Sequence, residues 1–248
     1  MVIEAHSGRV LATHEPSAPK PVASLTKIAT AVIVLDWAKA SQTDLGAYAM
    51  VPASTATIGG ANPMGLQPGD RITLRNALYS ALLGSDNAAA HTLANHVGLA
   101  ILKTRNQPGD TVKTFVQEMN QLAKALGMKK TKFANPHGLD HGEQRGYSTA
   151  SDMVRLAVYA MRNSGFAFFV KQKSRKVSFV RGDKQLSFTV QNTNQLLGTQ
   201  DINGVKTGMT AAAGQCLATS SERTPLVEKL PDGRSKLTKR RLVCVVLG

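Results

Sequence analysis

The sequence predicts an α+β fold in which strands from both ends of the chain form an antiparallel sheet flanked by helices, with an all-helical lobe inserted between them in the sequence. Strand-like segments lie near both termini, helical runs fill the middle, and 42% of the 248 residues are hydrophobic, enough for one sizeable core. We expect a single domain over residues 1–248. Its sheet subdomain would comprise about 1–23 and 163–248, and its helical lobe about 24–162.

The elements follow in order from periodicity and turn signals. Strand-like residues 2–4 and 9–14 flank a His-Ser-Gly turn and predict a hairpin. Helices are expected at the apolar or amphipathic runs 24–39, 73–83, 88–97, 111–126 and 149–162. Loops are expected at 62–70 and 135–139, which contain Pro and Gly. Strands are predicted at 177–180, 185–190, 204–208, 214–220 and 241–247.

A serine and a lysine three residues apart, Ser24 and Lys27, open the first helical run. Residues i and i+3 share a helix face, so the amine can reach the hydroxyl and take its proton, which makes Ser24 a candidate nucleophile and Lys27 its base. Ser17 and Lys20 have the same spacing, but neighbouring prolines exclude a regular helix there. Because serine is also a common N-cap residue, the pair needs support from elsewhere in the chain.

Two later triplets supply that support. In Ser85-Asp86-Asn87, between two helices, Ser85 could relay a proton to a leaving amine and Asn87 could bind a substrate amide. An ordinary turn between helices is the alternative for this triplet. In the strand-like Lys206-Thr207-Gly208, the first two residues offer a cation and a hydroxyl to a substrate carboxylate.

Glycine at position 208 would let the backbone come close to a ligand, although an ordinary edge-strand lysine at 206 is the simpler interpretation of this triplet taken alone. The backbone N–H groups of Ser24 and Met209 would then form an oxyanion hole. The side chain of Met209 would play no part in it.

Thirty basic against sixteen acidic residues give a formal charge of +14. This balance fits a basic surface, an anionic polymer such as cell-wall material, or an anionic membrane face. The basic clusters at 171–176 and 234–241 flank predicted strands, so solvated strand edges also explain them. With 5% aromatic residues and no stacking or zinc-finger motif, nucleic acid is excluded as a partner.

Other side chains predict no cofactor or metal. Cys216 and Cys244 lie in apolar runs and are expected to be buried free thiols, with a disulfide left open. His137, Asp140 and His141 cluster but lack a fourth ligand for a metal. No segment has the length of a membrane span and no signal peptide precedes residue 2, so membrane association is not encoded here and an export signal would lie upstream.

Five segments together resemble the penicillin-binding D-alanyl-D-alanine carboxypeptidases, which are low-molecular-mass serine peptidases. They are Pro21–Lys27, Leu66–Asp70, Asn135–Asp140, Tyr147–Asp152 and Gly204–Thr210. The resemblance covers essentially the whole chain and includes the motif trio of penicillin-binding proteins and serine β-lactamases. It implies a β-lactamase/transpeptidase-like fold.

The activity implied by the resemblance is removal of the terminal D-alanine from peptidoglycan stem peptides ending in D-Ala-D-Ala. This reaction would run through a Ser24 acyl-enzyme without metal or organic cofactor, and β-lactams would act as covalent inhibitors. The implied location is extracytoplasmic, in the periplasm or on the cell-wall side. The implied roles are peptidoglycan synthesis, cell-wall biogenesis and maintenance of cell shape.

Two departures keep other functions open. The chain ends at Gly248, where members of the resembled family continue into a further helix. Asp86 stands where many members carry glycine or alanine, and an aspartate at this position is more typical of class A β-lactamases. A β-lactamase needs a glutamate in a Glu-x-x-Leu-Asn context, which neither Glu118 nor Glu143 provides. A DD-endopeptidase shares all three motifs. A non-catalytic cell-wall-binding module would not need the Ser24–Lys27 pair.

Overall fold

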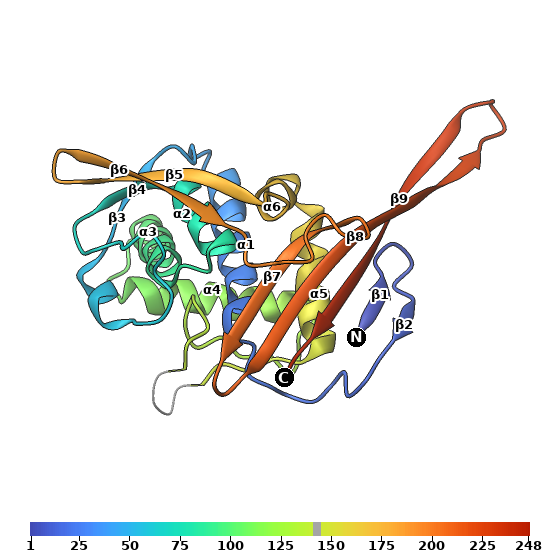
Figure 1. Ribbon diagram of the computed structural model, residues 1–248, viewed down its shortest axis with the longest axis horizontal. Coiled ribbons are helices and arrows are strands. Elements are labelled where there is room, and N and C mark those ends of the chain that lie inside the picture. The colour runs from blue at the N-terminus through green and yellow to red at the C-terminus, as the bar shows by residue number, and fades with distance from the viewer. Residues whose placement is uncertain (141–144) are drawn as a thin grey trace.

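A computed structural model describes residues 1–140 and 145–248 of the chain. Its larger sheet has five strands in the order β2-β1-β9-β8-β7 (Figure 1). These are β1 (Val2–Glu4), β2 (Val10–Ala12), β7 (Ile202–Thr210), β8 (Gly214–Lys229) and β9 (Ser235–Val246). Because β1 pairs antiparallel with β9, with Val2 opposite Cys244, both termini do form this sheet, as the sequence predicts.

A second sheet of four strands corrects part of the predicted layout. Its order is β3-β4-β5-β6, and its members are β3 (Tyr48–Met50), β4 (Arg71–Thr73), β5 (Ser174–Arg181) and β6 (Lys184–Gln191). The hairpin β5–β6, assigned from sequence to the terminal sheet, pairs instead through β5 with the short lobe strand β4, which in turn pairs with β3. The lobe is therefore not purely helical.

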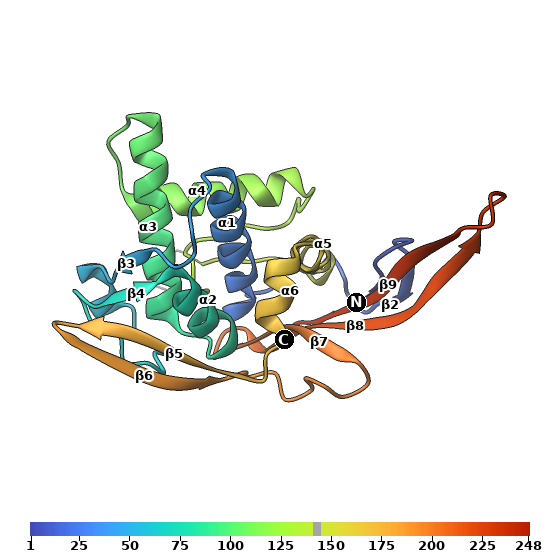
Figure 2. The same ribbon diagram turned by 90° about the horizontal axis from the view of Figure 1, so that it is seen from above.

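The helices gather on one side of the two sheets (Figure 2). They are α1 (Thr26–Ala40), α2 (Leu74–Leu83), α3 (Asn87–Arg105), α4 (Thr111–Ala125), α5 (Ala150–Arg162) and α6 (Ser164–Val170), with short 3-10 helices η1 (Ala23–Leu25) and η2 (Ala53–Thr57). Most of α1 is buried on every side, which explains why its apolar residues are not confined to one face of the helix. The central position of α1 holds the residues that follow Ser24 in the interior of the molecule.

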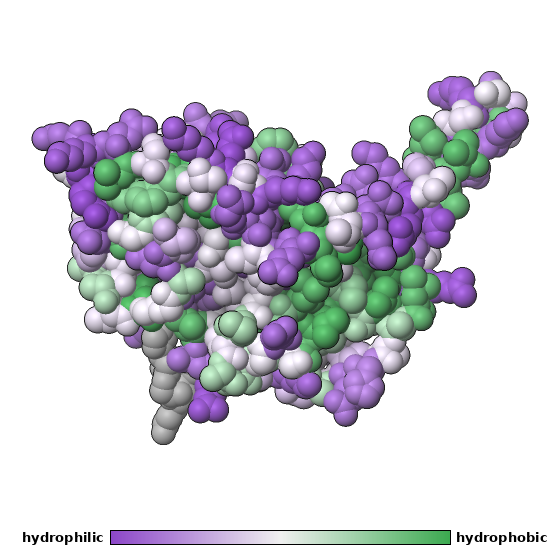
Figure 3. Space-filling model, viewed as in Figure 1, coloured by the Kyte–Doolittle hydropathy of each residue, from purple (hydrophilic) through white to green (hydrophobic). Residues whose placement is uncertain are grey.

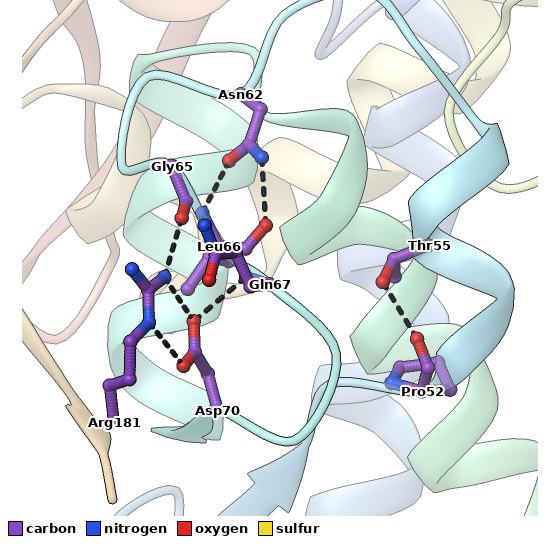
Figure 4. A network of polar contacts seen from close by, with 8 residues as sticks. All are labelled: Pro52, Thr55, Asn62, Gly65, Leu66, Gln67, Asp70 and Arg181. Atoms are coloured by element: carbon purple, nitrogen blue, oxygen red, sulfur yellow. Dashed lines mark hydrogen bonds and ion pairs between the residues drawn. The ribbon is translucent and has the colours of Figure 1, made fainter.

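A charged contact fastens the loop before β4 to the second sheet (Figure 4). Arg181 on β5 donates through Nε and Nη2 to the two carboxylate oxygens of Asp70, each at 2.8 Å, and through Nη2 to the carbonyl of Gly65 at 2.7 Å. The Asp70 carboxylate is buried and also accepts from the backbone N–H of Gln67. This bidentate geometry fixes the loop 62–70 against β5.

The hairpin formed by β8 and β9 is longer than the sequence predicts. Pairing continues from Leu217 opposite Val246 to Lys229 opposite Ser235, so residues 223–240 form an arm that projects beyond the helices (Figure 1). Both cysteines are free thiols, as expected, although Cys244 is only half-buried. Among the described residues, no helix is both long and apolar enough to cross a bilayer.

Candidate active site

Ser24 lies on η1, immediately before α1, where strand β7 passes beside it. The backbone at Ala23 has φ = 45°, and the N–H of Leu25 donates to the carbonyl of Val22 to close the turn. A Cβ atom added at Gly208 would stand 2.9 Å from the Ser24 nitrogen and 3.1 Å from the Val22 oxygen. Glycine at 208 is thus required by the close approach of β7 to the nucleophile's own backbone N–H, one of the two expected oxyanion donors.

Lys27, in the first turn of α1, makes three short contacts and is fully buried. Its Nζ lies 2.8 Å from Ser24 Oγ, 2.7 Å from Asn87 Oδ1 and 2.9 Å from the carbonyl oxygen of His137. The predicted i, i+3 contact is therefore present, with Ser24 on the 3-10 turn and Lys27 on the helix. Residues far apart in the chain, 87 and 137, complete the surroundings of the amine.

The protonation state of Lys27 decides what these contacts do. Burial lowers the pKa of Lys27 well below its usual value, the nearby Lys206 ammonium lowers it further, and Asp86 acts in the opposite direction. A neutral amine has two N–H bonds and one lone pair. With Asn87 Oδ1 and the His137 carbonyl accepting the two N–H bonds, the lone pair is left for the Ser24 hydroxyl, whose proton it can accept.

The triplet at residues 85–87 reaches the site through Asn87, whose side-chain amide already makes hydrogen bonds within the protein. Asn87 Nδ2 donates to the carbonyl of Gly59 at 3.1 Å while Oδ1 accepts from Lys27, so both ends of the amide are engaged within the protein. Because Nδ2 has a second N–H and Oδ1 a second lone pair, binding of a substrate amide by Asn87 stays a prediction. Asn87 first of all orients the base.

The other two residues of this triplet have different surroundings. Asp86 is buried and caps α3: it accepts from the Ala89 N–H at 3.0 Å and from Ser80 Oγ at 2.7 Å. Burial raises the pKa of Asp86, opposed by these hydrogen bonds and by Lys27. Ser85 adopts φ = 60° at the turn between α2 and α3, and its half-buried hydroxyl makes no hydrogen bond to any described residue. That hydroxyl is available for the predicted proton relay.

The triplet at residues 206–208, on β7, has one side chain in the interior and one that reaches the surface. Lys206 is buried, its Nζ donates to the carbonyl of Thr207 at 3.0 Å, and burial lowers its pKa to about 7. Thr207 is half-buried and its hydroxyl shares a hydrogen bond with that of Thr193. Met209 is 74% exposed, in keeping with a residue that contributes only its backbone N–H. Lys206 is therefore no ordinary edge-strand lysine.

The segment around His137 belongs to the site through its backbone, which the sequence analysis missed. The ring of His137 accepts from the Leu139 N–H through Nδ1, while its carbonyl accepts from Lys27. Asn135 Oδ1 accepts from the N–H groups of His137 and Gly138 and shapes this turn. The proposed third member of a metal cluster, His141, lies outside the described residues, and within them no group of three His, Cys, Asp or Glu side chains could hold a metal.

Comparison with known proteins identifies the family of this chain. Residues 1–227 match the family described as D-alanyl-D-alanine carboxypeptidase. A D-alanyl-D-alanine endopeptidase of Pseudomonas aeruginosa is 33% identical over 243 residues, covering 96% of this chain and 72% of that protein. A D-alanyl-D-alanine carboxypeptidase of Bacillus subtilis is 28% identical, covering 90% of this chain and 53% of its own length.

The solved structures agree. The crystal structure of the Streptomyces K15 DD-transpeptidase superposes with a TM-score of 0.81 at 29% identity, covering 100% of this chain and 87% of that one. The chain spans about half to three quarters of the length of the two relatives compared above. The family match, the shared fold and the Ser24–Lys27 contact lead to one conclusion: the chain belongs to the D-alanyl-D-alanine carboxypeptidase family of serine peptidases.

Proposed function

We propose that this protein is a serine-type carboxypeptidase that removes the terminal D-alanine from peptidoglycan stem peptides ending in D-Ala-D-Ala. The observation that carries the proposal is the 2.8 Å contact between Ser24 Oγ and a fully buried Lys27 whose pKa is lowered well below its usual value. An amine kept neutral beside a hydroxyl is the arrangement that general-base activation of a serine requires.

The geometry supports the following acylation step. Ser24 Oγ bonds to the carbonyl carbon of the penultimate D-alanine while its proton passes to Lys27 Nζ. The carbonyl oxygen becomes an oxyanion that accepts from the backbone N–H groups of Ser24 and Met209. The C–N bond then breaks, and the leaving D-alanine amine takes a proton, for which the Ser85 hydroxyl is the proposed relay. Water later attacks the ester carbonyl while Lys27 accepts its proton. The bond between the carbonyl carbon and Ser24 Oγ then breaks, and the proton passes from Lys27 to Oγ, which restores the free serine and the neutral amine.

Two members of the β7 triplet would bind the substrate carboxylate. Thr207 offers a half-buried hydroxyl at the strand that passes Ser24, and the buried Lys206 adds positive charge behind it. With a pKa of about 7, Lys206 would gain charge when an anionic carboxylate binds, because a nearby negative charge favours the ammonium form. We therefore propose that Thr207 and Lys206 recognise the C-terminal carboxylate of the substrate peptide.

A DD-endopeptidase is the second candidate, because relatives of that name in Pseudomonas aeruginosa and Escherichia coli are 33% and 30% identical to this chain. A β-lactamase is less well supported. Glu118 lies on α4 in an ion pair with Arg105 at 2.8 Å, the Asp86 carboxylate is committed to capping α3, and Glu143 lies outside the described residues. We therefore expect slow hydrolysis of a penicilloyl adduct, so that β-lactams act as covalent inhibitors.

The cellular role follows from the substrate. Peptidoglycan stem peptides are found outside the cytoplasmic membrane, so we propose an extracytoplasmic location and a part in cell-wall synthesis and cell shape. A non-catalytic wall-binding module remains the alternative of another class. It has no use for a buried amine aligned on a serine, and it would keep its wall binding when Ser24 is replaced.

The decisive test combines a fluorescent penicillin with two peptide substrates. The wild type should form an adduct stable for hours and release D-alanine from a pentapeptide ending in D-Ala-D-Ala, and Ser24→Ala should do neither. Ser17→Ala is the matched control, because Ser17 has the same Ser-x-x-Lys spacing in the proline-rich segment and is exposed. Cleavage of a cross-linked dimer in preference to the pentapeptide would favour an endopeptidase. Rapid loss of the penicillin adduct would favour a β-lactamase, and the absence of any adduct would favour a binding module.

A further inference from the structure

A groove of about 800 Å³ lies where the arm leaves the body of the molecule. One wall is made by the C-terminal end of α5 and by α6, and the other by the base of the β8–β9 hairpin. Hydrophilic side chains gather at this junction (Figure 3). None of the lining residues belongs to the catalytic site, so the groove is a separate feature of the fold.

Positive charge is concentrated around this groove. Its lining includes six basic side chains, which are Arg162, Lys171, Arg223, Lys239, Arg240 and Arg241. Two of them have acidic partners, because Arg241 pairs with Glu222 at 3.2 Å and Arg240 lies 3.8 Å from Glu4. The other four are exposed and form no ion pair with any described residue. Four uncompensated charges therefore surround one hollow.

Like charges held around a concave surface raise the local potential and attract anions. Arginine presents a planar fork of donors that matches phosphate and carboxylate oxygens. The four free cations come from both walls, with Arg162 and Lys171 on the helical side and Arg223 and Lys239 on the arm. Lys171 lies over the ring of Phe168, 5.6 Å from its centroid, which restrains its ammonium group at the rim.

We propose that this groove binds an anionic polymer, one whose repeating phosphate or carboxylate groups lie between the arm and the α5–α6 wall. An extended chain can enter a concavity and meet cations on both sides, whereas a flat bilayer surface would contact only the rim. If the proposed function holds, such binding would keep the enzyme on the cell wall and raise the local concentration of its polymeric substrate. The binding itself does not depend on Ser24.

The test measures binding of two labelled probes, inorganic polyphosphate and poly-L-glutamate, by fluorescence anisotropy in about 0.1 M salt, where exposed charges more than about 10 Å apart are screened. The variant Arg162→Gln/Lys171→Gln/Arg223→Gln/Lys239→Gln should bind the preferred probe at least tenfold more weakly. The control Lys103→Gln/Lys113→Gln/Lys124→Gln/Lys129→Gln removes the same charge from exposed positions outside the groove. It should bind within a factor of about two of wild type.

Each remaining outcome decides the matter. The preferred probe identifies phosphate or carboxylate as the repeating group. Equal weakening in both variants would overturn the proposal, because net charge alone would then explain the binding. No binding of either probe by wild type would overturn it as well. Groove-dependent binding to anionic phospholipid vesicles without binding to either polymer would replace the polymer with a membrane surface. Penicillin acylation should be unchanged in both variants, so a failed groove and a failed active site are distinguishable.

Discussion

The Nζ atom of Lys27 lies 2.7 Å from Oδ1 of Asn87, and this single contact joins the Ser-x-x-Lys motif to the triplet at residues 85–87. Asn87 is the first residue of α3 and is buried, with its Nδ2 fixed on the Gly59 carbonyl. The amide is therefore oriented before any substrate arrives. It holds one N–H of Lys27 and leaves the lone pair of the amine directed at Ser24.

The first prediction concerns Asn87→Asp. A carboxylate at this distance favours the ammonium form, so the pKa of Lys27 should rise and less neutral base should remain at pH 7. We expect the rate constant for penicillin acylation to fall by roughly tenfold or more, and the acid limb of its pH profile to move to higher pH. Stopped-flow fluorescence between pH 5 and pH 10 measures both.

Asn87→Ala is the matched variant, because it removes the acceptor without adding charge. Loss of an acceptor disfavours the ammonium form, so its acid limb should move to lower pH while the plateau rate falls through poorer alignment of the amine. If the acid limb of the acylation rate moved in the same direction in both variants, the role assigned to Asn87 would be contradicted.

The second prediction concerns Lys206, whose charge lowers the pKa of Lys27. In Lys206→Met that repulsion is gone, so the pKa of Lys27 should rise and the acid limb of acylation should move to higher pH. Met209→Ala serves as the control on the same strand, since its side chain is 74% exposed, and its pH profile should match wild type. An unchanged limb in Lys206→Met would show that the two lysines do not interact.

The third prediction uses the same variant to measure stability. Burial lowers the pKa of Lys206 from 10.5 in the unfolded chain to about 7 in the folded protein. A base whose pKa is lowered in the folded state must lose a proton on folding at any pH between its two pKa values, and this loss lowers the free energy of unfolding. The contribution of Lys206 to that free energy is therefore most favourable above pH 10.5 and is lost as the pH falls toward 7. The free-energy difference between Lys206→Met and wild type should therefore grow by about 1 kcal/mol per pH unit from pH 10 down to pH 7.

Urea unfolding at several pH values measures that difference, because groups common to both proteins cancel. Below about pH 7 the difference should become constant. A difference that is flat across pH 7 to 10 would mean that Lys206 keeps an ordinary pKa in the folded state.

How far the sequence predicts this site depends on what each residue contributes. Ser24 and Lys27 are close in sequence, and helical spacing alone brings them together. Asn87 was identified as a site residue, but its partner was not, because local sequence does not reveal which long-range group satisfies a buried amide. His137 was examined for its ring, whereas the structure uses its carbonyl, and a backbone acceptor leaves no side-chain signal in the sequence.

The fold shows the same division. Longer helices and the strands of both termini were predicted because their apolar residues either repeat with a clear period, as in α4 and α5, or form a long apolar run, as in α1. The three-residue strands β3 and β4 were missed, because such short strands are stabilised by their neighbours in the sheet rather than by their own pattern. The arm was missed for a related reason: its residues 222–229 are exposed on both faces, so no alternation of apolar and polar residues marks the extension of β8.

The fourth prediction concerns the approach of β7 to the nucleophile. In Gly208→Ala the new methyl group would stand 2.9 Å from the Ser24 nitrogen and 3.1 Å from the Val22 oxygen, and the strand must move away. Displacing an oxyanion donor typically costs about 100-fold in rate, so acylation should slow by that order while the fold persists. Circular dichroism checks the fold, and acylation within threefold of wild type would show that β7 does not supply the oxyanion donor.

The fifth prediction separates backbone strain from steric overlap at Gly138. This residue has φ = 85°, and a Cβ atom there would stand only 1.9 Å from the carbonyl oxygen of Ala23, next to the nucleophile. Gly138→Ala should lower the free energy of unfolding by roughly 3 kcal/mol or more, because both the conformation and the contact are unfavourable. Gly69→Ala is the matched control: its φ is 88° with open space around it, so it should lose only about 1–2 kcal/mol. Equal losses in urea unfolding would mean that the 137–138 turn is free to move away from Ala23, and the carbonyl of His137 would then be a poor anchor for Lys27.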